Sequence, residues 1–232
     1  MNTLVSYQLE SSIATVTMDD GKVNALSPEM FVQLGRAFDQ AEADRAPVVL
    51  TGRQGVFSAG FSLPVLRAGG PDAAALLRAG FDLATRLLAF PAPVVIACNG
   101  HAIAMGLFLV LSADYRIGVT GPAKLTANEV AIGMTLPYAA IEICRQRIAP
   151  AHLPRVVALA EPYTPEEGIA AGLVDRVVPA AELQTAARGV ATQLQALDRA
   201  AFAATKQRLR EPTLAALRTA LAADGFPPAA SR

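Results

Sequence analysis

The sequence predicts an α/β protein whose strands are joined by right-handed helical crossovers. Short runs of apolar, β-branched residues recur along the first half of the chain, and loops follow them. Stretches of helical length separate these runs and carry apolar residues three and four positions apart. A repeated order of strand, loop and helix is typical of α/β folds, because parallel strands need such crossover connections.

The first elements are predicted from alternation and helix capping. A hairpin is expected over Leu4–Leu9 and Ile13–Met18, which alternate around the polar tip Glu10-Ser11-Ser12. Ser27 as N-cap and Pro28 in the first turn predict the start of a helix. The core-facing stripe of this helix comprises Phe31, Leu34, Ala37, Phe38 and Ala41.

The middle of the chain alternates strands with loops and helices. Strands are expected at Val48–Thr51, Val94–Ala97 and Tyr115–Val119. The glycine-rich range Gly52–Gly60 is expected to be a loop, and Asn99-Gly100 a turn. Helices are expected over residues 72–89, before Pro91 and Pro93, and from Met105 to about Leu111.

The last hundred residues are predicted to be mostly helical. From Pro137 onward one strand, Val174–Val178, interrupts the helical pattern. Three alanine-rich helices are expected over residues 182–197, 199–210 and 212–222. The tail Gly225–Arg232 is rich in proline and alanine and is expected to be frayed.

Composition excludes several classes of protein. The 232 residues are 53% hydrophobic and 17% charged, which argues against intrinsic disorder and suggests apolar surface buried between subunits. The formal net charge is zero, so no basic field would hold a nucleic acid. The N-terminus lacks the features of a signal peptide, and no apolar stretch has the length of a membrane span. Cys98 and Cys144 are expected to be buried free thiols, so we expect a cytoplasmic protein without membrane partners.

The common catalytic motifs are absent from the sequence. It contains no HExxH, no CxxC and no cluster with metal-ligand spacing, so no metal site is expected. His101 and His152 are expected to hydrogen-bond or to lie at the surface rather than to act as bases. Asp114 is expected to be a cap or turn residue, and Arg116 a structural one.

Two loops remain as candidates for chemistry. Residues 57–63 and 99–106 each follow a buried strand and use small residues, which permit close backbone approach. Two such loops can aim two backbone N–H groups at one oxygen and so form an oxyanion hole. The alternative is that both are tight turns that serve only packing.

Several motifs resemble the crotonase superfamily, which contains enoyl-CoA hydratases and isomerases. The matching segments are Lys22-Val23-Asn24-Ala25-Leu26, Phe57-Ser58-Ala59-Gly60, Asn99-Gly100-His101-Ala102, Asp114-Tyr115-Arg116-Ile117, Asn128-Glu129-Val130 and residues 171–179. The resemblance covers nearly the whole chain, in order. It implies a ClpP-like spiral of ββα units over residues 1–195 and a helical C-terminal segment over 196–232. That segment is expected to serve oligomerisation or as a lid and to be truncated relative to relatives.

The resemblance also implies acyl-CoA thioester substrates and assigns residues to them. The oxyanion-hole N–H groups would belong to Phe61 and Met105. The groove for CoA and pantetheine would be lined by Val23, Ala25, Ala59, Phe61, Leu63 and Met105. Coenzyme A would enter as part of the substrate, with no separate cofactor. The family further implies a homotrimer or a hexamer, and the apolar faces after residue 182 favour such an interface.

The acid–base positions favour one reaction of the family. Hydratases carry two glutamates, and here the first position is Phe108 while the second matches Glu129. A double-bond shift needs one base, which removes a proton at C2 and returns it at C4. Apolar residues after Glu129 would raise its carboxyl pKa toward neutrality. An isomerase that uses Glu129 is therefore preferred, and a hydratase-like enzyme or a non-catalytic acyl-CoA-binding scaffold is the alternative.

Overall fold

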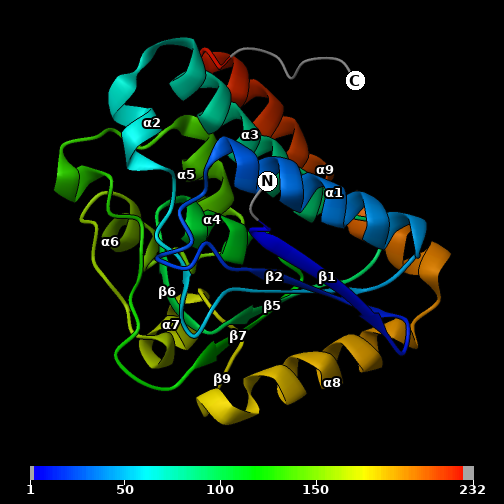
Figure 1. Cartoon of the computed structure of the whole chain (residues 1–232). Helices are drawn as coiled ribbons and strands as arrows, with labels where there is room; N and C mark the ends of the chain where they lie inside the picture. The colour runs from blue at the N-terminus through cyan, green and yellow to red at the C-terminus, as the bar shows by residue number, and fades with distance from the viewer. Residues whose placement is uncertain (1–2, 227–232) are drawn as a thin grey trace.

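A six-stranded sheet forms the centre of the protein, as the computed structural model of residues 3–226 shows (Figure 1). Its strand order is β1-β2-β3-β5-β7-β9. β1 and β2 pair antiparallel, and every later pair is parallel. The strands span Val5–Glu10 (β1), Ile13–Met18 (β2), Val48–Thr51 (β3), Val94–Cys98 (β5), Tyr115–Val119 (β7) and Arg176–Val178 (β9).

A second sheet of three short parallel strands lies beside the first. It contains β4 (Gly55–Ser58), β6 (Gly100–Ile103) and β8 (Leu125–Thr126). Each pass of the chain adds one strand to each sheet, as β3 then β4, β5 then β6, and β7 then β8. This repeated ββ step, followed by helices, is the spiral that the resemblance implied, so the predicted fold class is confirmed.

Helices cover both faces of the large sheet (Figure 1). The alternation along β5 shows why, since Val94, Ile96 and Cys98 enter one core and Val95 and Ala97 enter the other. Helix α8 covers the second face, and most other helices lie over the first. The helices span Pro28–Ala43 (α1), Leu63–Ala68 (α2), Gly70–Ala89 (α3), Met105–Leu111 (α4), Tyr138–Arg145 (α5), Leu153–Val157 (α6), Pro165–Ala171 (α7), Leu183–Gln195 (α8) and Arg199–Ala223 (α9). Single 3₁₀ turns span Val130–Ile132 (η1) and Ala180–Glu182 (η2).

The capping predicted for α1 is present. The Ser27 Oγ accepts a hydrogen bond from the Met30 N–H at 3.1 Å, and Pro28 occupies the first turn. The stripe predicted from Phe31 to Ala41 is buried against the sheet. Local sequence therefore sets the start and the orientation of this helix.

The second sheet corrects two predictions. The expected loop Gly52–Gly60 contains β4, and the expected turn at Asn99-Gly100 is the point where the chain leaves β5 and enters β6. These strands are too short to show alternation, and they form because neighbouring backbones approach closely. A Cβ on Gly100 would lie 2.0 Å from the carbonyl carbon of Gly55, so only glycine allows β4 and β6 to pair there.

The C-terminal helices also differ from the prediction. Residues 199–210 and 212–222 form one helix, α9, with Pro212 inside it. Pro212 removes one hydrogen bond but is exposed, so water can solvate the freed carbonyl. The packing of α9 on α3 and α5 holds the helix together across the proline. The expected helix 182–197 corresponds to α8, which η2 precedes. The expected strand Val174–Val178 begins only at Arg176. Most of the tail predicted to be frayed lies outside the described residues.

Candidate active site

Two segments that are far apart in sequence run side by side at the end of the second sheet. The Ala59 N–H donates to the Val23 carbonyl at 3.0 Å, and the Leu26 N–H donates to the Gly60 carbonyl at 2.8 Å. The buried Asn24 side chain donates to the carbonyls of Met18 and Phe57 and fixes this arrangement. The loop around Gly60 is therefore held rigidly against the spiral.

Gly60 brings that loop onto the turn that precedes α4. Its φ of +88° lies in the left-handed region, and a Cβ at this position would meet the Ile103 carbonyl oxygen at 2.9 Å. The same Cβ would lie 3.5 Å from the backbone nitrogen of Met105. Only glycine permits this approach, which places the residue after it, Phe61, next to the N-terminus of α4.

Two backbone N–H groups at this junction lack partners within the described part of the chain. No acceptor among residues 3–226 takes a hydrogen bond from the N–H of Phe61 or of Met105. Met105 is the first residue of α4, where backbone N–H groups have no partner inside the helix. These are the two donors that the resemblance assigned to an oxyanion hole, and neither is engaged by another described residue.

The residue before Met105 has an unusual backbone conformation. Ala104 has φ 52° and ψ −123°, which is the first central position of a type II′ turn and strongly favours glycine. The Ala104 N–H donates to the Thr126 carbonyl at 2.9 Å, so β8 helps to hold this strained residue. The strain sits where the Met105 N–H must be aimed, as is common at functional sites.

Replacing Ala104 with glycine should stabilise the protein. Glycine adopts this conformation without a Cβ penalty, so the free energy of unfolding should rise by about 1 kcal/mol. Urea denaturation of A104G against wild type measures the change. Ala102, buried in regular strand β6, is the matched control, and A102G should destabilise. A stability loss in A104G as large as that in A102G would show that the conformation carries no strain.

A small cavity of about 160 Å³ lies where the Gly60 loop meets the start of α4. Four of the predicted site residues line it, namely Ala59, Phe61, Leu63 and Glu129. Met105 itself does not line it, although its neighbours Ala104 and Phe108 do. Val23 and Ala25 do not line it either, because their segment forms the outer edge of the Gly60 loop. The remaining lining residues are Leu66, Leu77, Phe81, Asn128, Ile132, Met134 and Pro137.

Among the residues that the structure describes, Glu129 is the only carboxylate that lines this cavity. Its side chain is 7% exposed, and no described residue donates a hydrogen bond to its Oε2. Burial raises the pKa of the carboxyl from its ordinary value to about 7. A carboxyl group with this pKa and one free oxygen can both accept and return a proton near neutral pH.

The apolar surroundings of Glu129 differ in part from the prediction. Ile132 and Met134 line the cavity, but Val130 is half exposed and Leu136 lies in the main core. Aromatic rings from other elements supply much of the wall, from Phe61, Phe81 and Phe108. Sequence reasoning missed Leu66, Leu77 and Phe81, whose helical periodicity resembles that of any core-facing residue.

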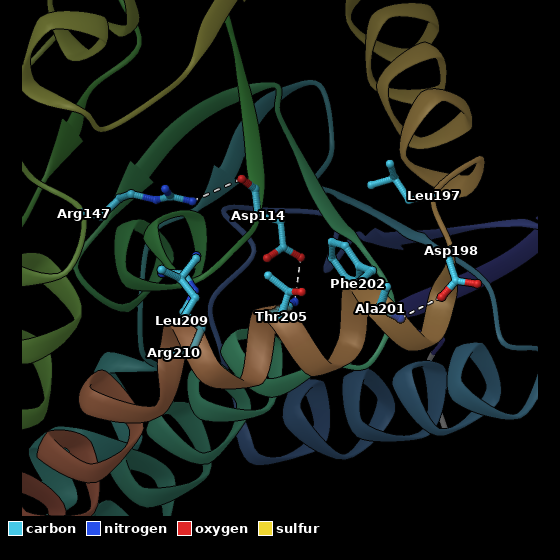
Figure 2. Close-up of a pocket in the computed structure, with 10 residues that line it drawn as sticks. Asp114, Arg147, Leu197, Asp198, Ala201, Phe202, Thr205, Leu209 and Arg210 are labelled. Atoms are coloured by element: carbon cyan, nitrogen blue, oxygen red, sulfur yellow. Dashed lines mark hydrogen bonds and ion pairs between the residues drawn. The ribbon is translucent and has the colours of Figure 1, made fainter.

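A larger cavity of about 440 Å³ lies under α9, and its polar side chains hold helices and strands together (Figure 2). Its two carboxylates are already engaged. Asp198 accepts from the Ala201 N–H at 2.8 Å and caps α9, whereas Asp114 accepts from the Val94 N–H and from Lys206. Figure 2 also shows Arg147 reaching the main chain of Asp114. Asp114 therefore links β5, β7 and α9, and the smaller cavity is the candidate active site.

The remaining candidate residues have structural partners. The Arg116 side chain is 2% exposed and forms a two-pronged ion pair with Asp175. His101 Nδ1 accepts from the Lys124 N–H, and the His152 ring hydrogen-bonds the Tyr163 hydroxyl. Cys98 and Cys144 are buried and free. Within residues 3–226 no helix is long and apolar enough to cross a membrane, and no group of three metal-binding side chains forms.

Comparison with known proteins places the chain in a family. The enoyl-CoA hydratase/isomerase family model matches residues 8–225, and the chain belongs to that family. It is 30% identical to the human mitochondrial enoyl-CoA delta isomerase 1, over 95% of this chain and 75% of that protein. It is 29% identical to a carnitinyl-CoA dehydratase of Salmonella, over 85% of this chain and 77% of that protein. The crystal structure of an enoyl-CoA hydratase/isomerase family protein from Pseudomonas syringae superposes with a TM-score of 0.94 at 46% identity, over 95% and 96% of the two chains.

Proposed function

We propose that this enzyme shifts the double bond of 3-enoyl-CoA thioesters to the 2-position, with Glu129 as its single acid–base group. The observation that carries the proposal is the cavity wall, in which Glu129 is the only carboxylate among the described residues. Phe108, at the position that the resemblance gives to the first glutamate of hydratases, also lines this wall. Hydration must orient water and also protonate carbon, work that the family divides between two carboxylates. One carboxyl group with a pKa of about 7 suffices for a proton shift.

The proposed reaction balances without a redox or metal step. Glu129 takes a proton from C2 of the 3-enoyl thioester, and the electron pair moves onto the thioester oxygen to form a dienolate. The N–H groups of Phe61 and Met105 would stabilise that oxygen. Glu129 then returns the proton at C4, and the double bond forms between C2 and C3. Coenzyme A enters and leaves as part of the substrate, and we propose no further cofactor.

The decisive assay uses pairs of isomeric thioesters. The purified enzyme is incubated with 3-hexenoyl-CoA and, separately, with 2-hexenoyl-CoA, and products are followed by ultraviolet absorbance and mass. We expect interconversion without a change of mass. A gain of 18 mass units would show hydration and would support the hydratase-like alternative. Binding without conversion would support the scaffold.

The pH dependence should report the Glu129 carboxyl. Because the base must be ionised in the free enzyme, kcat/KM should rise about tenfold per pH unit below about pH 7 and level off above it. The profile is measured with 3-hexenoyl-CoA from pH 5 to pH 9. A nearly flat profile over this range would mean that the carboxyl keeps its ordinary pKa of 4.5 and that Glu129 is solvated in the working enzyme.

We further propose that the protein forms a homotrimer or a hexamer built from two trimers. The support is the apolar surface around the larger cavity, where Leu197 is 48% exposed and Leu209 is 73% exposed (Figure 2). Exposed leucines that line one cavity favour burial against another subunit. Light scattering should give at least three times the 24.2 kDa mass of the chain. A monomer at micromolar concentration would remove this proposal. A cytoplasmic location stays a prediction.

A further inference from the structure

Three stacked aromatic rings close the inner end of the active-site cavity. Phe81 on α3 stacks on Phe108 of α4, with ring centroids 6.4 Å apart and an interplanar angle of 22°. Phe81 also stacks on Phe226, at 5.7 Å and 12°. Phe81 and Phe108 line the cavity, whereas Phe226 does not. The row therefore runs from the wall beside Glu129 to the segment that follows α9.

The C-terminal segment is anchored to the cavity wall in a defined way. The Asp224 carboxylate accepts hydrogen bonds from the N–H groups of Tyr138 at 2.8 Å and Ala139 at 3.0 Å, and so caps α5. Pro137, immediately before these residues, lines the cavity. Phe226 follows Asp224 by two residues and packs against the main core. The end of α9 thus holds the Phe226 ring against Phe81, whose own side chain is 1% exposed.

The cavity beside Phe81 is small. Its volume of about 160 Å³ is below the roughly 300–1,000 Å³ that is typical of small-molecule pockets. A short acyl chain would fill most of it. A longer acyl chain would have to displace Phe81, whose side chain is 1% exposed and stacks on Phe226.

We propose that the protein selects short acyl chains over long ones, and that Phe226 sets this preference by holding Phe81 in place. This inference rests on the proposed function, since it assumes that the cavity holds the acyl group of a thioester. Phe226 acts through Phe81 and does not touch the substrate, so it is a specificity-determining residue rather than a catalytic one.

The experiment measures binding rather than turnover, so that it does not depend on isomerase activity. Dissociation constants are determined by calorimetry for the saturated thioesters butanoyl-CoA, octanoyl-CoA and dodecanoyl-CoA. Wild type should bind butanoyl-CoA at least tenfold more tightly than dodecanoyl-CoA. In F226A the Phe81 ring can retreat, and dodecanoyl-CoA should bind at least as tightly as butanoyl-CoA. Each additional methylene buried should improve binding by about fourfold.

Matched variants separate this role from general loosening of α9. Phe202 lies on the same helix, half-buried beside the larger cavity, and F202A should leave the chain-length ratio unchanged. F81L removes the middle ring of the row and should shift the ratio of the dodecanoyl-CoA and butanoyl-CoA dissociation constants in the same direction as F226A. If one of these two variants does not fold, the other still tests the inference. A wild type that binds dodecanoyl-CoA as tightly as butanoyl-CoA would overturn the inference, as would an unchanged ratio in F226A. Failure to bind any thioester would instead overturn the proposed function, and this inference with it.

Discussion

Replacing Glu129 with glutamine is expected to lower isomerase turnover by at least about 100-fold, the usual contribution of a general base. Glutamine keeps the shape of the side chain but cannot take a proton. The thioester would still contact the Phe61 and Met105 N–H groups and the aromatic wall, so the affinity for butanoyl-CoA should change little. The fall should therefore appear in kcat.

The same variant should gain stability at alkaline pH. The carboxyl has a pKa of about 7 in the folded protein and 4.5 ordinarily, so the folded state holds its proton more tightly. Folding stability is therefore lost as pH rises from about 4.5 to about 7, and stays low above that range. At 1.36 kcal/mol per pKa unit the loss is about 3 kcal/mol. E129Q escapes this loss, and its free energy of unfolding should exceed that of wild type at pH 8.

An exposed glutamate provides the control for both measurements. Glu182 lies on η2 at the surface, and E182Q should leave turnover and the pH dependence of stability unchanged. Equal turnover in E129Q and wild type would place the base elsewhere. A stability curve for E129Q parallel to that of wild type between pH 5 and pH 8 would show that the carboxyl is not buried in solution.

Replacing Lys206 with methionine should have the largest effect on folding. Lys206 is 5% exposed, and its Nζ lies 2.6 Å from the Asp114 Oδ2 and 3.2 Å from the Leu87 carbonyl. Methionine fills a similar volume but leaves the Asp114 carboxylate without its ammonium partner. Removing one member of a buried pair costs about 3–5 kcal/mol. Because Asp114 is 15% exposed and keeps the Val94 N–H, we expect the lower end of that range.

Urea denaturation, analysed as a double-mutant cycle, tests this ion pair. D114N removes the charge but keeps an oxygen for the Val94 N–H, so K206M/D114N should be more stable than K206M alone. Lys124 has an exposed side chain, and K124M should change stability by less than about 0.5 kcal/mol. Equal stability of K206M and K124M would mean that α9 is not fixed through Asp114. Turnover of the folded fraction should remain, since Lys206 lies outside the active-site cavity.

The sequence by itself determined the local elements and indicated the candidate reactive groups. Alternation in β1 and β2 and the Ser27 cap of α1 depend on residues within a few positions, and the structure confirms them. Glu129 was found because it is the one carboxylate at an acid–base position of the family that the sequence resembles. The structure places Ala59, Phe61 and Leu63 with it around one cavity. Val23 and Ala25 lie outside that lining, and their contact with CoA stays a prediction.

Tertiary structure alone decided how these elements divide and what closes the site. The strands β4, β6 and β8 have two to four residues, too few to show a period, and they form only because the spiral brings their backbones together. Pro212 predicted a break that the packing of α9 on α3 and α5 overrides. The row of Phe108, Phe81 and Phe226 joins residues up to 145 positions apart, and local sequence carries no signal for such contacts. Hydrophobic burial is non-directional, so only the folded topology determines which buried ring lines the cavity.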